Sequence, residues 1–275
     1  MGIESFAAAS SLAQVYWDVS PVLIRVGPLA VRWYGLGWFL AFAIGYLIVR
    51  RMYRQEGKPE ADLDRLLLYM VGGAIIGARL GHFLFYRPGY LLEHPLEVIA
   101  IWRGWRGLAS HGGAAGIMIA FYFYSRRRPD QPYLWLLDRI AAPTALGGCF
   151  IRLGNLMNSE ILGVPTDVAW AVVFARVDSL PRHPAQLYEA SAYFLIFLLL
   201  FGLYRKLRPN IPHGLLAGLF LVSVFGARFL IEFVKERHAA YAAELPLSVG
   251  QMLSIPLVVI GAWLVGRGLL QARRE

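Results

Sequence analysis

Charged residues are scarce in this 275-residue chain: Asp, Glu, Lys and Arg together make up 16% of it, whereas hydrophobic residues make up 57%. Soluble domains carry about 25% charged residues, so this composition excludes a typical cytosolic enzyme and a disordered chain. Cysteine is almost missing as well, since Cys149 is the single one. Neither an internal disulfide nor a multi-cysteine metal site can therefore form. The positive mean hydropathy of +0.51 instead indicates a protein embedded in a bilayer.

Several motifs of well-known catalytic sites are also missing. The sequence contains no Walker loop, no Gly-x-Ser-x-Gly nucleophile elbow and no His-Glu-x-x-His motif. Cys149 lies in an apolar stretch, and apolar surroundings disfavour the thiolate. We therefore interpret Cys149 as a packing residue in preference to a nucleophile.

Hydrophobic stretches recur along the chain, separated by basic residues or by Pro and Gly. A membrane helix needs about 20 residues. The sequence therefore predicts an all-α integral membrane protein, a single polytopic domain with seven transmembrane helices. The predicted helices cover residues 33–50, 66–86, 107–125, 134–157, 187–204, 215–234 and 245–266.

Lys and Arg are distributed unequally between the two ends of these helices. They are concentrated after the first, third and fifth predicted helices and in the C-terminal tail. The positive-inside rule then places the N-terminus outside and the C-terminus in the cytoplasm. Because the cations flank apolar runs, the net charge of +9 indicates attraction to anionic lipid and no nucleic-acid partner. Residues 158–186, with several prolines and a strand-like segment at 169–174, are expected to form a small periplasmic cap.

A few titratable side chains fall inside the predicted helices or at their ends. Near the centre of a bilayer a charge costs from about 2.5 to more than 10 kcal/mol, so each of these residues marks a candidate site. They are Arg79, His111, Arg152, Glu160, Glu189, Arg228 and Glu232. All except Arg79, whose depth is open, lie towards the outer ends of their helices. This pattern predicts a polar site that faces the outer side of the membrane.

Arg152, Asn155 and Ser159 are spaced i, i+3 and i+7, which places them on one face of a helix. An arginine beside amide groups suits a phosphate, because the guanidinium can bind two oxygens at once. Alternatively, Arg152 pairs with Asp138 or Glu160 and holds helices together. The spacing alone fits both interpretations equally.

Arg228 and Glu232 are spaced i, i+4 in a predicted membrane helix. They form either a self-neutralising pair inside the membrane or a functional pair in which Glu232 orients Arg228 towards an anionic ligand.

His111 precedes two glycines at the start of a predicted helix. An imidazole can exchange a proton near neutral pH, and the glycines allow a ligand to approach backbone N–H groups at a helix N-terminus. A structural histidine is nevertheless the commoner case. Gly73, Gly77 and Gly81 recur at every fourth position, which favours close helix packing over a ligand-lining role.

Residues 182–189 combine several polar and titratable groups before the fifth predicted helix. They could bind a substrate, or they could attach the cap to the helices by hydrogen bonds. The second interpretation is favoured.

The order of these segments resembles the bacterial prolipoprotein diacylglyceryl transferase family. The resemblance runs from Gly27 to Gly261 and rests on several motifs in sequence order. These motifs lie at residues 32–35, 77–81, 110–113, 152–160, 182–189, 228–233 and 247–254. One such motif would be weak, but the ordered set on a seven-helix hydropathy profile is specific.

This resemblance implies transfer of the diacylglyceryl group of phosphatidylglycerol to the lipobox cysteine thiol of a prolipoprotein, with release of sn-glycerol 1-phosphate. It also implies a multi-pass protein of the bacterial inner membrane, whose active site faces the periplasm and whose partners are membrane lipids and the prolipoprotein. No cofactor and no metal is implied. The alternatives are a membrane phospholipid transporter and a phospholipase-like hydrolase; the sequence shows no transporter-type internal repeat.

With this reaction in view, each candidate residue receives an expected role. We expect His111, Arg152 and Arg228 to be catalytic, with His111 accepting the thiol proton and Arg228 stabilising the departing phosphate. Arg152 is also expected to anchor the phosphate of phosphatidylglycerol. The expected substrate-binding partners of these residues are Asn155, Glu160, Tyr34 and Glu232.

Overall fold

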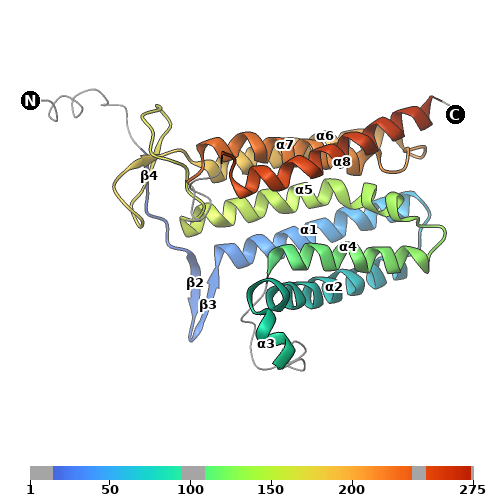
Figure 1. The fold of residues 1–275 in the computed structure, drawn as a ribbon, viewed down its shortest axis with the longest axis horizontal. Coiled ribbons are helices and arrows are strands. Elements are labelled where there is room, and N and C mark those ends of the chain that lie inside the picture. Colours follow the sequence, from blue (N-terminus) through green and yellow to red (C-terminus); the bar gives the residue numbers. More distant parts are fainter. Residues whose placement is uncertain (1–14, 94–108, 237–245, 274–275) are drawn as a thin grey trace, which may run out of the picture. The chain divides into compact units, whose positions relative to one another are not determined.

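The computed structural model describes residues 15–93, 109–236 and 246–273, and most of them are helical. Figure 1 shows the order of these elements along the chain. The helices are α1 (Trp33–Gln55), α2 (Glu60–Tyr86), α3 (Pro88–Glu93), α4 (Ser110–Arg126), α5 (Tyr133–Asn158), α6 (Ala185–Leu207), α7 (Leu215–Ile231), the 3₁₀ helix η3 (Glu232–Val234) and α8 (Val249–Ala272).

Each of the seven predicted membrane helices coincides with one long helix of the structure. Within the described ranges, six helices are long and apolar enough to cross a membrane: α1, α2, α5, α6, α7 together with η3, and α8. Helices α4 and α7, with 17 residues each, are the shortest of the long helices. Residues 107–108 and 245, which begin two of the predicted helices, lie outside the described residues.

The described chain forms two compact units. The first comprises the residues up to Ile48 and those from Asp138 onward, and the second comprises Val49–Leu137. Helices α1 and α5 each contribute to both units.

The second unit is built around close contact between α2 and α4, which run side by side in Figure 1. A Cβ atom placed on Gly77 would collide with the backbone of Gly112 and Gly116, and one on Gly116 would collide with Gly73. The backbones approach this closely because both helices present glycine at the contact. The prediction that the glycine repeat serves helix packing is therefore confirmed.

Replacing Gly116 with valine should separate α2 from α4. We expect the free energy of unfolding to fall by about 2–3 kcal/mol, as for other overpacked cores, with a lower thermal midpoint in detergent. Gly72→Ala is the matched control, because no atom lies within 4 Å of a Cβ built at Gly72. Equal midpoints for Gly116→Val and the wild type would contradict the packing role.

In the first unit, glycines and a buried carboxylate position the helices that carry the candidate site. Helices α7 and α8 meet at Gly218 and Gly261, whose backbones leave no room for a Cβ on either side. Asp138 of α5 accepts hydrogen bonds from the backbone N–H groups of Gly214 at 2.7 Å and Ala217 at 2.9 Å. Asp138 therefore satisfies the first turn of α7 and does not pair with Arg152.

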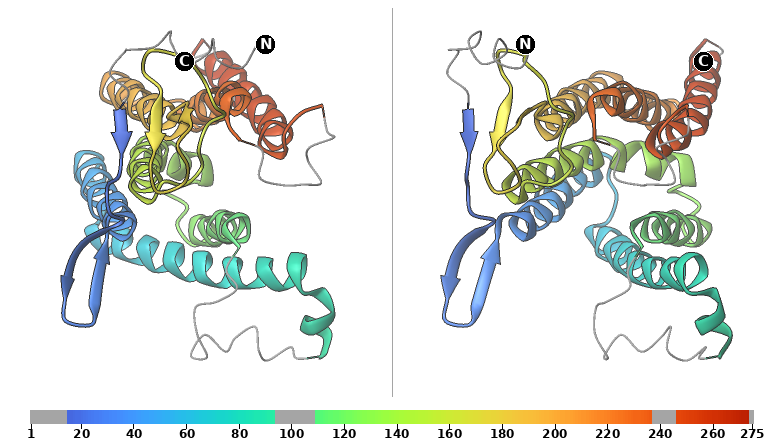
Figure 2. Two further views of the ribbon diagram at one scale, coloured as in Figure 1. Left: turned by 90° about the vertical axis from the view of Figure 1, so that its left-hand side faces the viewer. Right: turned by 60° about the vertical axis from the view of Figure 1, so that its left-hand side comes forward.

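Two small sheets make the fold less purely helical than the sequence predicts. Strands β2 (Val22–Val26) and β3 (Leu29–Arg32) form an antiparallel hairpin before α1, visible in Figure 2. Its turn is Gly27–Pro28, and Gly27 has a φ of +60°, which glycine adopts without strain. The β-branched residues of 22–31 favour strands, although the hydropathy pattern alone does not distinguish them from the start of a membrane helix.

The second sheet joins two strands of the predicted cap to a strand from before the first helix, in the order β1 (Val15–Trp17), β4 (Val172–Phe174) and β5 (Pro181–Arg182). Strand β1 is parallel to β4, and Figure 2 shows them side by side. The strand-like segment predicted at 169–174 is thus confirmed in its second half. Trp17 packs on a small apolar cluster around Phe174 and donates its indole N–H to the carbonyl of Leu156, 3.0 Å away. This contact ties the sheet to the end of α5.

Candidate active site

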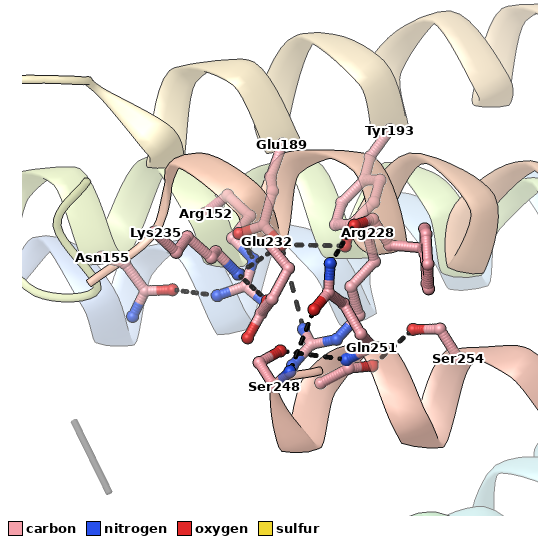
Figure 3. A network of polar contacts seen from close by, with 12 residues as sticks. Arg152, Asn155, Glu189, Tyr193, Arg228, Glu232, Lys235, Ser248, Gln251 and Ser254 are labelled. Atoms are coloured by element: carbon pink, nitrogen blue, oxygen red, sulfur yellow. Dashed lines mark hydrogen bonds and ion pairs between the residues drawn. The ribbon is translucent and has the colours of Figure 1, made fainter. Parts of the chain in front are cut away.

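Several charged residues of the first unit come together at one end of four helices. Figure 3 shows side chains that converge from the last turns of α5, the first turn of α6, the end of α7 with η3, and the start of α8. Residues 159–184, which connect α5 to α6 and include β4 and β5, leave the helices at this same end.

Glu189 of α6 is the centre of this cluster. Its carboxylate lies 2.8 Å from Nε of Arg152, 2.9 Å from Nζ of Lys235 and 3.8 Å from a terminal guanidinium nitrogen of Arg228. Glu189 is fully buried. A buried carboxylate of this kind requires cationic partners, and here the partners come from two other helices and the segment after η3. Guanidinium groups from two separate helices therefore face one carboxylate.

The three cations differ in how firmly they are held. The side chains of Lys235 and Arg152 are 6% and 14% exposed, whereas that of Arg228 is 30% exposed. Arg228 also has the longest contact with Glu189. Arg228 is therefore the cation with the most unused hydrogen-bonding capacity for a ligand.

A second chain of hydrogen bonds extends from Arg152 along the end of α5. Arg152 donates to the amide oxygen of Asn155 at 3.2 Å, and Asn155 donates to Glu160 at 3.2 Å. Asn158 also donates to Glu160, at 3.1 Å. Glu160 is thus linked to Arg152 through Asn155, and the direct Arg152–Glu160 pair considered from the sequence is replaced by this relay.

Ser159 does not continue the helical face of Arg152 and Asn155, so that part of the sequence prediction is wrong. Helix α5 ends at Asn158, and Ser159 and Ile161 have φ values of 54° and 58°. This left-handed backbone is uncommon for residues other than glycine, particularly for a β-branched one, and costs about 1–3 kcal/mol per residue. The reversal holds Glu160 next to the amides of Asn155 and Asn158.

The predicted Arg228–Glu232 pair is not the one that the described residues form. Glu232 pairs with Lys235 at 3.3 Å, and Arg228 faces Glu189. The Glu232 backbone N–H still donates to the carbonyl of Arg228, so the two residues remain one helical turn apart. Their side chains take other partners because the buried Glu189 carboxylate lies beside Arg228, and Lys235 follows the end of η3 next to Glu232. Lys235 follows three residues after Glu232 and comes to lie beside it.

Tyr34, in the first turn of α1, packs directly against α5. A Cβ atom on Gly154 would lie 2.9 Å from Cδ2 and 3.1 Å from Cα of Tyr34. The glycine between Arg152 and Asn155 therefore allows α1 to approach the part of α5 that carries the site. The role of Tyr34 in substrate binding stays a prediction.

The first part of the 182–189 segment attaches the cap to the helices, as the favoured interpretation holds, whereas Glu189 at its end belongs to the cluster described above. Arg182 pairs with Asp178 at 2.6 Å and with Glu236 at 3.3 Å, and it donates to the carbonyl of Gly163 at 3.1 Å. The hydrogen bond from Arg182 holds the pKa of the Asp178 carboxyl below its usual range. Because Glu236 follows Lys235, these bonds also fix the segment that carries Lys235.

The side chain of Gln186 supports the site from the cap side. It donates to the backbone carbonyl of Glu160 at 2.5 Å. Val164 N–H in turn donates to the carbonyl of Val234 at 2.9 Å, next to Lys235. These two hydrogen bonds therefore fix the backbone next to two charged residues of the site, Glu160 and Lys235.

His111 and Arg79 belong to the second unit. The His111 ring lies 5.1 Å from the ring of Phe85 and 6.1 Å from that of Tyr86, and Arg79 lies over the ring of Phe83 at 5.0 Å. The role of His111 as a proton acceptor stays a prediction. Cys149 is buried, and no cluster of three metal-ligating side chains occurs among the described residues.

Sequence reasoning did not assign the two residues that organise the cluster, Glu189 as its centre and Lys235 as its third cation. The sequence does carry a signal for Glu189, because a carboxylate one turn into an apolar helix requires a partner. Lys235 lies just after the sixth predicted helix and carries no such signal, because its burial depends on the contact between the cap and residues 234–236.

Comparison with known proteins covers nearly the whole chain. A family model described as prolipoprotein diacylglyceryl transferase matches residues 21–267. The chain is 54% identical over 261 residues to the phosphatidylglycerol–prolipoprotein diacylglyceryl transferase of Chloroherpeton thalassium, which covers 95% of this chain and 97% of that protein. The proteins of the same name from Tolumonas auensis and Bacteroides fragilis are 51% and 43% identical, over 95% and 92% of this chain and 99% and 94% of theirs. The chain therefore belongs to the prolipoprotein diacylglyceryl transferase family.

Proposed function

We propose that the cluster around Glu189 is where this enzyme holds the phosphate of its lipid substrate. As a member of its family, the protein transfers the diacylglyceryl group from phosphatidylglycerol to a prolipoprotein. The transporter and the hydrolase considered from the sequence are therefore set aside. The observation that carries the site assignment is the half-buried Arg228, with its long contact to Glu189, beside the buried Arg152–Glu189 pair.

The charge changes of the reaction explain why arginines suit this site. The lipobox thiolate attacks the glyceryl carbon of phosphatidylglycerol, a C–S bond forms, and the C–O bond to phosphate breaks. The electron pair of that bond stays on sn-glycerol 1-phosphate, so a phosphodiester monoanion becomes a monoester that approaches a dianion. Cations placed in advance next to this phosphate stabilise the transition state more than the ground state.

The individual residues take distinct roles in this proposal. Arg152, fixed by Glu189 and Asn155, binds two phosphate oxygens through its guanidinium. Arg228 moves from its long contact with Glu189 to the oxygen on which charge develops. Tyr34 and Glu160 hydrogen-bond the glycerol of the head group.

The carboxylates of the cluster keep this cationic site stable before lipid binds. Glu189 and Glu232 offset part of the charge of Arg152, Arg228 and Lys235. Glu232 therefore acts through Lys235, and not through Arg228 as the sequence suggested.

The finer membrane arrangement is part of the same proposal. We infer seven transmembrane helices, with α4 as the third, an outer N-terminus and a cytoplasmic C-terminus in the bacterial inner membrane. The supporting observation is that Arg205 and Lys206 lie in the last turn of α6, whereas Glu189 lies near its start. The Glu189 cluster and the cap of residues 158–186 then face the periplasm.

A single transfer assay tests the function. The purified protein is incubated with phosphatidylglycerol and a lipobox peptide, and the peptide is analysed by mass spectrometry. We expect its mass to increase by one diacylglyceryl group only when both substrates are present. Release of free diacylglycerol without peptide modification would indicate a hydrolase, and lipid movement without any covalent product would indicate a transporter.

If His111 accepts the thiol proton, its loss should matter most where the thiol is protonated. A free thiol has a pKa of about 8.5, so His111→Gln should lower turnover by about 10²–10⁴-fold at neutral pH and less at alkaline pH. The measurement is the pH profile of kcat between neutral and alkaline pH. His82→Gln is the matched control, since the His82 ring stacks on Tyr86 in the same unit. Full activity of His111→Gln at neutral pH would contradict the role.

A further inference from the structure

Gly250, in the first turn of α8, leaves the space that the carboxylate of Glu232 occupies. A Cβ atom built on Gly250 would lie 2.5 Å from Oε1, 2.7 Å from Cδ and 2.9 Å from Oε2 of Glu232. Real Cβ atoms do not approach other heavy atoms this closely. While Glu232 keeps its place, position 250 can therefore hold only glycine.

The backbone of Gly250 gives no other reason for a glycine. The residue lies inside a regular helix, where alanine is intrinsically more favourable. The requirement is therefore spatial, and the atoms that impose it belong to a single charged side chain.

Helix α8 cannot easily move away to make room for a larger residue. Ser248 and Gln251 form a reciprocal capping box, with hydrogen bonds of 3.1 Å and 2.9 Å. These bonds, and the one that Ser254 donates to the carbonyl of Gly250 at 2.7 Å, lie within α8 and fix only its first turns. Helix α8 is held against α7 by the hydrogen bond from Gln251 to the carbonyl of Phe229 at 3.3 Å and by the close contact of Gly261 with Gly218. Figure 3 shows Ser248, Gln251 and Ser254 along the start of α8, in the same network of polar contacts as Arg228 and Glu232. A side chain at position 250 would therefore displace Glu232 and not the helix.

Displacement of Glu232 would propagate to the cations of the site. Glu232 lies 3.3 Å from Nζ of Lys235, and the same nitrogen lies 2.9 Å from Oε1 of Glu189. That oxygen of Glu189 is the one that Arg228 faces. In its present place the Glu232 carboxylate also lies at the N-terminus of α8, where the helix dipole favours a negative charge.

We propose that Gly250 is a positioning residue of the phosphate site. Because Gly250 has no side chain, the Glu232 carboxylate can lie against the first turn of α8. This position of Glu232 in turn fixes Lys235, Glu189 and Arg228. The proposal rests on the phosphate-binding role of the cluster and extends it to α8. It gives the segment 247–254 a role in the site although its described side chains form none of the ion pairs with Glu189.

The test is a double-mutant cycle between position 250 and the length of the acidic side chain. Gly250→Ala should lower kcat by about tenfold to 100-fold, as misplacement by roughly 1 Å does in other active sites. Glu232→Asp shortens the side chain by one methylene and makes room for the new methyl group. We therefore expect Gly250→Ala/Glu232→Asp to have the kcat of Glu232→Asp alone, so that the second substitution rescues the first. Gly266→Ala is the control, because nothing lies within 4 Å of a Cβ at that position of α8.

Wild-type kcat for Gly250→Ala, or a double variant whose loss is the product of the two single losses, would overturn the proposal. If Gly250→Ala does not fold, the double variant still tests the proposal, because it must fold and have the same kcat as Glu232→Asp. The same cycle is also measured by thermal unfolding, which reports the steric coupling without reference to catalysis. If the effects of the two substitutions on the unfolding midpoint are not additive, but Arg152→Lys has full turnover, then Gly250 positions Glu232 and the cluster is not the phosphate site. If the effects of the two substitutions on the unfolding midpoint are additive, then Gly250 does not position Glu232 by steric contact.

Discussion

Arg152→Lys should lower kcat for diacylglyceryl transfer by about 10²–10³-fold, the effect of losing one preorganised donor to a developing anion. The substitution keeps the positive charge. It removes the planar fork through which Arg152 contacts Glu189 and Asn155 and, in our proposal, two phosphate oxygens. The measurement is steady-state transfer to a lipobox peptide in phosphatidylglycerol vesicles.

A second arginine provides the control for this experiment. Arg176 lies in the cap, is exposed, and donates to the carbonyl of Val19 at 3.4 Å. Arg176→Lys should leave turnover unchanged. Wild-type turnover in Arg152→Lys would remove Arg152 from the mechanism and leave it with a purely structural role.

Glu189→Gln should have the largest effect on stability. It removes the buried negative charge shared by Arg152, Lys235 and Arg228, and breaking a buried ion pair by neutralising one partner costs about 3–5 kcal/mol. We expect a lower thermal unfolding midpoint in detergent together with loss of transfer activity, because the cations then repel one another.

Glu236→Gln is the matched control for this variant. Glu236 also pairs with a buried arginine, Arg182, but its side chain is 42% exposed. Exposed ion pairs contribute about 0–1 kcal/mol, so Glu236→Gln should unfold close to the wild type. If the two variants lost stability equally, Glu189 would not be the organising residue of the site.

The helices could be predicted from sequence because their signal is local. An apolar stretch bounded by basic residues indicates a membrane helix without knowledge of its neighbours, and each predicted stretch coincides with a long helix. The glycine spacing at Gly73, Gly77 and Gly81 predicted packing for the same reason. The hairpin of β2 and β3 was missed because its apolar residues continue directly into α1.

The partners of the charged residues could not be predicted, because they depend on which helix ends meet. Asp138 and Arg152 lie on one helix, yet Asp138 binds the start of α7 and Arg152 pairs with Glu189 of α6. Glu232 pairs with Lys235, which follows the end of η3, and Ser159 departs from the predicted face because its φ is positive. Sequence identified most of the charged residues, and the fold determined their pairing.

The most direct test of the account is an experimental structure of the protein with a phosphonate analogue of phosphatidylglycerol. The account predicts phosphonate oxygens within hydrogen-bond distance, about 2.7–2.9 Å, of the guanidinium groups of both Arg152 and Arg228. It also predicts that Glu189 keeps its contact with Lys235. A phosphonate bound elsewhere, with both arginines still engaged only by Glu189 and Asn155, would contradict it.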